Sequence, residues 1–153
     1  YFVCGPPGSG KTFLSTAIAH RVWLEGGKAE VYLFSKLMEL ILDRTPDQER
    51  AVLNHLARLD CLVIDDLGMG TATETKFEFL QEILTARYNA YKNGLVITSN
   101  LPLGGDEKSG VFGIAEKYGD KIGDRIYELC DYVEIDPQTP SARGLKKQER
   151  KKA

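Results

Sequence analysis

One segment near the start of the chain constrains its fold more than any other. It reads Gly5-Pro6-Pro7-Gly8-Ser9-Gly10-Lys11-Thr12, which fits the phosphate-loop pattern GxxxxGK[ST]. This pattern requires a strand before it and a helix after it, and the apolar run Tyr1–Cys4 and the helical pattern Lys11–Glu25 supply both. Glycines let the backbone close around an anion, with successive N–H groups pointing inward. The segment therefore predicts a site for a nucleoside triphosphate.

Two side chains of this loop have specific expected roles. Lys11 should reach the β- and γ-phosphates as a point charge, and the Thr12 hydroxyl should ligate Mg²⁺. The helix that starts at Lys11 adds its positive dipole end at the same place. We therefore expect ATP and Mg²⁺ as cofactors. The predicted nucleotide contacts come from Gly5, Pro6, Pro7, Gly8, Ser9, Gly10, Lys11, Thr12 and Phe13.

Strand-like and helical patterns alternate along the rest of the chain. The predicted strands are Tyr1–Cys4, Ala29–Phe34, Cys61–Ile64, Leu95–Thr98 and Tyr132–Ile135. The predicted helices are Lys11–Glu25, Lys36–Leu42 with Ser35 as its N-cap, Asp47–Leu59, Thr73–Lys92 and Asp120–Leu129. Leu101–Gly119 is interpreted as an irregular surface segment. Such alternation is typical of βαβ units, so the predicted fold class is α/β, with helices on both faces of a parallel sheet.

Length and composition indicate one globular domain. The chain has 153 residues, 42% of them hydrophobic and 27% charged, which is near the average for soluble proteins. No apolar run approaches the roughly 18 residues that cross a bilayer, so we expect no membrane segment. The first strand lacks the features of a signal peptide, and we expect the native protein to continue upstream of it. Cys4, Cys61 and Cys130 lie in or beside apolar runs, which favours buried free thiols in the cytoplasm.

The charge is unevenly distributed. The net charge is −2, but residues 146–152 contain five bases and one acid, so residues 1–145 carry −6. We therefore expect an ATP-binding domain at residues 1–145 and a basic, disordered tail at residues 146–153. The chain lacks the overall basic character of nucleic-acid-binding proteins, so any contact with DNA must be local or depend on assembly.

Polar side chains follow two of the predicted strands. Asp65 and Asp66 end the run that begins at Cys61, and Asn100 follows Leu95–Thr98. The carboxyl ends of parallel strands meet at the edge where the phosphate loop also lies. We therefore predict that Asp65 holds Mg²⁺, that Asp66 orients or deprotonates the attacking water, and that Asn100 contacts the γ-phosphate or positions the water. The alternatives are a solvated acidic loop and a turn-forming asparagine.

Four segments together resemble a known family. GPPGSGKT, LVIDDLG, VITSNLP and YGDKIGDRI, in this order and at this spacing, look like the AAA+ ATPases of the DnaC/IstB type, which are helicase loaders and transposition helper ATPases. The likeness covers about residues 1–145. It implies a P-loop NTPase fold of the ASCE type with a five-stranded parallel sheet in 5-1-4-3-2 order. It also implies ATP-dependent oligomers with nucleotide sites between subunits.

The resemblance assigns roles residue by residue. Lys11 and Thr12 match the Walker A pair, Asp65 and Asp66 the Walker B pair, and Asn100 the sensor 1 residue. Arg125 matches the arginine finger, which acts in trans on a neighbour's γ-phosphate. Four further residues are weaker candidates: Lys121 as an alternative finger, Arg143 as the arginine that senses nucleotide in cis, and Lys36 and Arg44, within Ser35–Arg44, as contacts to single-stranded DNA.

The chain departs from the family pattern in two ways. Many AAA+ proteins have Asp-Glu at the end of the Walker B strand, whereas this chain has the shorter Asp65-Asp66, and we expect its hydrolysis of ATP to be weak unless the protein is assembled. Family members also carry an N-terminal extension that binds the replicative helicase or the transposase, and it is absent from this sequence. The sequence therefore does not identify the protein partner.

The sequence is compatible with four functions. The leading hypothesis is a DnaC-like helicase loader that assembles with ATP on a replicative helicase and single-stranded DNA and is released by hydrolysis. The second is an IstB-like transposition helper. A P-loop kinase that phosphorylates a small molecule is less favoured, because the sequence shows no arginine-bearing lid. A module that binds ATP without hydrolysing it is the fourth.

Overall fold

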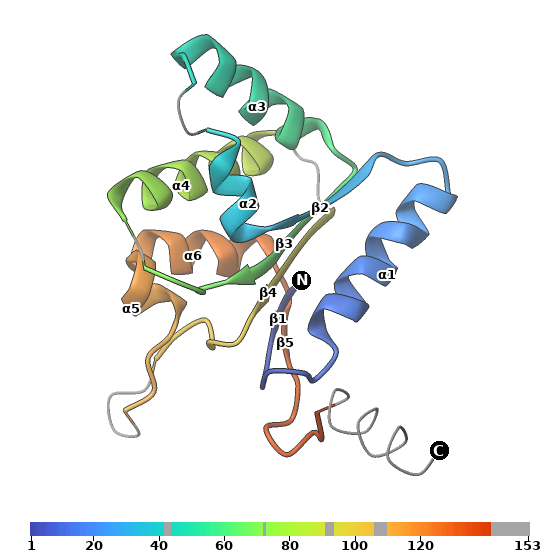
Figure 1. The fold of residues 1–153 in the computed structure, drawn as a ribbon, viewed down its shortest axis with the longest axis vertical. Helices are drawn as coiled ribbons and strands as arrows, with labels where there is room; N and C mark the ends of the chain where they lie inside the picture. The colour runs from blue at the N-terminus through green and yellow to red at the C-terminus, as the bar shows by residue number, and fades with distance from the viewer. Residues whose placement is uncertain (42–43, 72, 91–93, 106–109, 142–153) are drawn as a thin grey trace.

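A computed structural model shows a five-stranded parallel sheet (Figure 1). It describes residues 1–41, 44–71, 73–90, 94–105 and 110–141. The strand order is β2-β3-β4-β1-β5, which confirms the expected 5-1-4-3-2 order read from the other edge. The strands are β1 (Phe2–Cys4), β2 (Ala29–Leu33), β3 (Cys61–Leu67), β4 (Gly94–Ser99) and β5 (Tyr132–Glu134).

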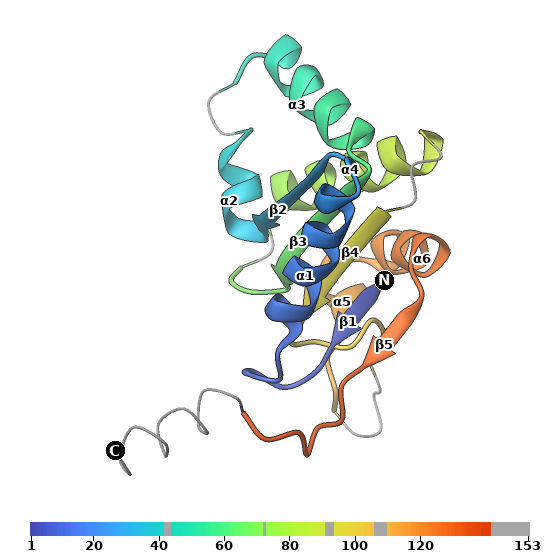
Figure 2. The same cartoon turned by 90° about the vertical axis from the view of Figure 1, so that its right-hand side faces the viewer.

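Helices cover the two faces of the sheet unequally. Figures 1 and 2 show α1 on one face, and α2, α4, α5 and α6 on the other. The helices are α1 (Lys11–Leu24), α2 (Phe34–Glu39), α3 (Pro46–Arg58), α4 (Glu74–Asn89), α5 (Ile114–Tyr118) and α6 (Asp120–Leu129). The larger hydrophobic cluster lies on the second face and the smaller one lies under α1. Among the described residues, no helix is long and apolar enough to cross a membrane.

Most predicted elements lie where the sequence places them, and the differences have local causes. The predicted cap Ser35 is wrong: α2 begins at Phe34, two residues before the predicted Lys36, and its N-cap is the extended Leu33, because buried Phe34 and Leu37 anchor the helix to the core. The interpretation of Leu101–Gly119 as irregular is also wrong in part, because it contains α5. That helix is only five residues long, too short for its apolar spacing to be recognised.

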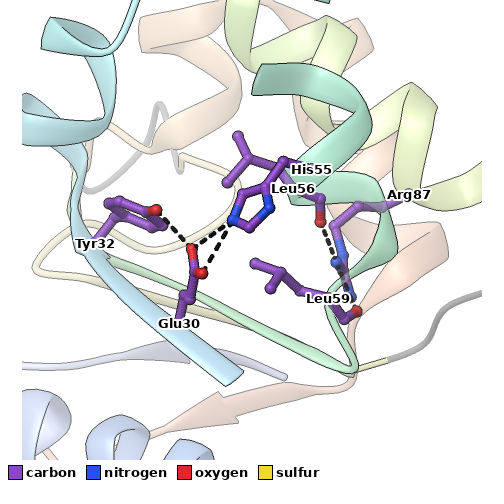
Figure 3. Close-up of polar contacts among 6 residues, drawn as sticks. All are labelled: Glu30, Tyr32, His55, Leu56, Leu59 and Arg87. Carbon is purple, nitrogen blue, oxygen red and sulfur yellow. Dashed lines mark hydrogen bonds and ion pairs between the residues drawn. The ribbon is translucent and has the colours of Figure 1, made fainter. Parts of the chain in front are cut away.

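At the amino ends of the strands, opposite the phosphate loop, a buried arginine joins three elements. Arg87, on α4, is 1% exposed. Its guanidinium donates to the carbonyls of Leu56 (2.7 Å) and Leu59 (3.2 Å), as Figure 3 shows, and to that of Gly94 (3.0 Å). It therefore satisfies the carbonyls at the end of α3, which have no helical partners, and ties that end to the start of β4.

A second polar cluster lies beside Arg87 on the outer strand (Figure 3). Glu30 on β2 accepts from the Tyr32 hydroxyl at 2.6 Å and lies 2.9 Å from Nε2 of His55 on α3. Burial opposes ionisation of Glu30, but these two hydrogen bonds outweigh it and lower the pKa of the carboxyl. Burial and Glu30 together raise the pKa of Tyr32 to about 12. The cluster fixes α3 against the edge of the sheet.

Candidate functional site

The phosphate loop connects β1 to α1 as the sequence predicts. Gly10 is the N-cap of α1, and Lys11 is its first residue. Lys11 is 5% exposed, and its ammonium donates to the carbonyls of Gly5 (2.8 Å) and Pro6 (2.9 Å). The side chain therefore folds back over its own loop, where its charge lies beside the amide groups that would surround a phosphate.

A pair of hydroxyls holds the carboxylate of Asp65. Thr12 on α1 donates to one carboxylate oxygen at 3.0 Å, and Thr98 on β4 donates to the other at 2.6 Å. Asp65 is only 7% exposed, so these contacts replace the water it would otherwise bind. The Thr12 hydroxyl and the Asp65 carboxylate supply oxygen ligands of the kind that Mg²⁺ prefers, and they come from the two elements predicted to share it. The residues present therefore fit the ion.

Asp66 occupies an irregular position in β3. The pairing of β3 with β4 shifts between Ile64 and Leu67, and Asp66 has a φ of 57°, in the left-handed region. Its backbone N–H donates to Oγ1 of Thr98 at 3.0 Å, which takes the place of a regular ladder bond. Such a bulge redirects the side chain that it carries. Asp66 thereby lines the phosphate-loop pocket, while the neighbouring Asp65 stays buried against Thr12.

Part of the predicted set lines one pocket of about 380 Å³, and Gly5, Pro6, Ser9 and Asp65 are not in its lining. It is lined by Pro7, Gly8, Gly10, Lys11, Thr12, Asp66, Met69 and Asn100. The amide of Asn100 lies 3.6 Å from the Met69 sulfur, across the mouth between the end of β4 and the loop after β3. Residues from three separate parts of the sequence therefore meet at the carboxyl edge of the sheet, as the fold class predicts.

Arg125 does not line this pocket. It lies on α6 beside a second depression of about 270 Å³, whose lining also includes Lys121, Asp124, Gln81 and Thr85. The Arg125 guanidinium stands 4.5 Å above the Tyr88 ring and donates to Glu128 at 2.7 Å. Its side chain is 31% exposed, so it is held in place and still reachable from outside.

The remaining candidates are less integrated into the pocket. Phe13 is 81% exposed on α1, next to the loop. Lys36 pairs with Glu39 within α2, and Arg44 is an exposed residue before α3. Arg143 and the predicted basic tail lie outside the described residues.

Sequence reasoning missed three residues that organise the site. Thr98 and Ser99 place two hydroxyls directly before Asn100, and the Ser99 hydroxyl donates to the Leu67 carbonyl at 2.7 Å. Consecutive hydroxyl residues at the end of an apolar strand were a signal that could have been recognised. Lys117 donates to the Gly68 carbonyl at 2.6 Å, and no local pattern indicates that contact.

Comparison with known proteins identifies the family. The family described as IstB-like ATP binding protein matches residues 2–153. The chain belongs to this family. The ATP binding named in the family's description agrees with the strand, loop and helix that form the phosphate pocket.

Two curated relatives and one solved structure illustrate its range. The chain is 31% identical over 104 residues to an insertion sequence ATP-binding protein of Sinorhizobium fredii, which is 65% of this chain and 33% of that protein. It is 27% identical over 105 residues to the replicative helicase loader DnaC of Escherichia coli K12, which is 66% of this chain and 43% of that protein. A crystal structure of the DnaC helicase loader superimposes with a TM-score of 0.71 at 24% identity, covering 88% of this chain and 77% of the other.

The solved structure and the curated relatives support different conclusions. The solved structure supports the AAA+ fold, because an identity below 25% carries fold information alone. The matched regions cover 33% and 43% of the two curated relatives, less than half of each, so the match does not carry the activities of those whole proteins to this chain.

Proposed function

We propose that this domain hydrolyses ATP and acts as the assembly switch of a DnaC-like helicase loader. The observation that supports it best is the division of the predicted machinery. Lys11, Asp66 and Asn100 line one pocket, whereas Arg125 is held on a different surface of the same chain. A second subunit would bring its Arg125 to the pocket of the first.

Within the pocket, each residue has one proposed task. Lys11 would leave the carbonyls of its own loop and bind the β- and γ-phosphates. Asp66 would orient the attacking water and accept its proton, and Asn100 would fix the γ-phosphate from the opposite side. Mg²⁺, held by Thr12 and Asp65, would neutralise charge on the phosphates. Arg125 of a neighbouring subunit would stabilise the charge that develops in the transition state, an effect that contributes about 10³–10⁵ in rate.

Assembly would then depend on ATP and be undone by hydrolysis. The proposed partners are further copies of this chain, a replicative helicase and single-stranded DNA, the last contacted from α2 through Lys36 and from Arg44. We place this action in DNA replication and in the cytoplasm. The DnaC relative and the DnaC fold support this assignment.

An IstB-like transposition helper is the second candidate. It would use the same pocket with a transposase as its partner, and the family match and the insertion sequence relative favour it. A small-molecule kinase gains no support, since it would leave Arg125 without a role.

The test is ATP hydrolysis per subunit as a function of protein concentration, with and without single-stranded DNA. We expect the rate per subunit to rise with concentration, and Arg125→Ala to reduce it by at least about 10³-fold with little change in nucleotide affinity. Arg50→Ala is the matched control, because Arg50 also pairs with an acid three residues away on an exposed helix face.

Mixing two inactive variants distinguishes action in trans from action in cis. Lys11→Ala has an impaired pocket and an intact arginine, whereas Arg125→Ala has the reverse. Equal mixtures should recover activity, because half of the mixed interfaces join an intact pocket to an intact arginine. Turnover that is independent of concentration and unaffected by Arg125→Ala would contradict the proposal.

A further inference from the structure

A lysine outside the nucleotide pocket holds the loop that follows β3, the strand that carries Asp65 and Asp66. Lys117, on α5, donates from Nζ to the carbonyl of Gly68 at 2.6 Å. Gly68 stands two residues after Asp66 and one before Met69, and both of these line the pocket. Hydrogen bonds from an ammonium group are shorter and stronger than those between neutral groups. The position of the loop therefore depends on α5.

Gly68 has little freedom to move elsewhere. Its φ is 97°, and a Cβ at this position would lie 3.0 Å from Leu101 Cδ1 and 3.1 Å from Ile114 Cδ1. The preceding carbonyl, that of Leu67, accepts from the Ser99 hydroxyl at 2.7 Å. The loop is thus held on one side by the end of β4, next to Asn100, and on the other side by α5.

The helix that carries Lys117 is itself fixed to the core. Tyr118 is 3% exposed and packs edge to face against Phe34, with ring centroids 5.9 Å apart. At its other end, the carboxylate of Glu116 accepts from the backbone N–H groups of Gly105 (2.9 Å) and Gly113 (2.8 Å). Because α5 is anchored at both ends, it provides a firm support for the Gly68 carbonyl.

The same helix packs closely against the helix that carries Arg125. A Cβ on Gly123 of α6 would lie 2.8 Å from the Cβ of Ala115 on α5, so the two helices approach as closely as glycine allows. Gly123 is two residues from Arg125. The loop after Asp66 and the helix that carries Arg125 are therefore both held by α5, the first through Lys117 and the second by direct packing.

We infer that Lys117 is a positioning residue, which fixes the loop after Asp66 and couples the nucleotide pocket to the helix that presents Arg125. It acts on Asp66 and Arg125 through the backbone and does not touch the nucleotide. The expected effect on kcat rests on the proposed function. The coupling of the loop to α6 through Lys117 does not depend on it.

Hydrogen–deuterium exchange tests the structural part without requiring turnover. In Lys117→Met, the amides of residues 65–71 should exchange about tenfold faster than in the wild-type protein, because the charged bond that holds them is lost. The matched control is Lys76→Met: Lys76 also donates to a carbonyl of this loop, that of Thr71 at 3.0 Å, but from an exposed position on α4. Addition of Mg²⁺ and the non-hydrolysable analogue AMPPCP should change exchange in residues 120–129 of the wild type and of Lys76→Met, and not of Lys117→Met.

Steady-state kinetics tests the catalytic part. We expect Lys117→Met to lower kcat about tenfold with the KM for ATP changed less than twofold, and Lys117→Arg, which keeps a cationic donor, to recover part of the loss. A parallel change in KM, or Lys117→Met behaving like Lys76→Met in both exchange and kcat, would overturn the inference. If the wild-type protein does not hydrolyse ATP, the proposed function fails, and the exchange data still decide whether Lys117 couples the loop to α6.

Discussion

Replacing Thr98 with valine tests whether a single hydroxyl maintains the geometry of the two acidic residues. Thr98 is fully buried, and valine has nearly the same shape. The substitution removes the donor to Asp65 at 2.6 Å and the acceptor for the Asp66 N–H at 3.0 Å. It therefore changes the polar contacts of the site while leaving its packing almost intact.

The expected loss of stability follows from these two bonds. A hydrogen bond to a charged group contributes roughly 1.5–3 kcal/mol, and a buried N–H left without an acceptor costs roughly 1–3 kcal/mol. Since Asp65 keeps its bond from Thr12, we take values near the lower ends and expect a loss of about 3 kcal/mol in the free energy of unfolding. With an m-value of about 2 kcal/mol per molar urea, the unfolding midpoint should fall by about 1.5 M.

Urea denaturation followed by circular dichroism measures this shift. Thr98→Ser is the control, because it keeps the hydroxyl and loses one methyl group, so its midpoint should fall by roughly a third as much. The nucleotide analogue should also require a higher Mg²⁺ concentration to bind Thr98→Val, because Asp65 is then oriented by one hydroxyl instead of two. A midpoint within about 0.3 M of the wild type, or equal effects of valine and serine, would refute the reasoning.

Two further predictions concern Arg87 and Glu30, which lie away from the phosphate loop. Arg87→Met removes the donor to two buried carbonyls and one partly buried carbonyl and should lower the free energy of unfolding by about 3 kcal/mol, measured by urea denaturation; a loss below about 1 kcal/mol would show that water replaces the guanidinium. Glu30→Gln tests the pH dependence, because the lowered pKa of Glu30 means that its ionised form stabilises the fold above its ordinary pKa of 4.5. The excess in Tm of the wild type over this variant should be present at pH 7 and disappear as the pH falls below about 4.5, and a constant difference between pH 7 and pH 3 would contradict it.

The sequence alone predicted what depends on local order along the chain. A strand, a glycine-rich loop and a helix are neighbours in sequence, so the place of Lys11 and Thr12 could be predicted from their spacing. The alternation of strands and helices predicted a parallel sheet, and in such a sheet the strand ends that carry Asp65 and Asn100 must share an edge. The strand order followed from the family resemblance and is confirmed by the structure.

Only the tertiary structure decided how the side chains at that edge differ from one another. Periodicity could not predict the bulge that buries Asp65 and turns Asp66 into the pocket, because that bulge depends on the register between β3 and β4. For the same reason, the contacts of Thr98 with both aspartates join residues more than thirty positions apart. The separation of Arg125 from the pocket, and the bond from Lys117 to Gly68, depend on how helices pack, which local sequence does not encode.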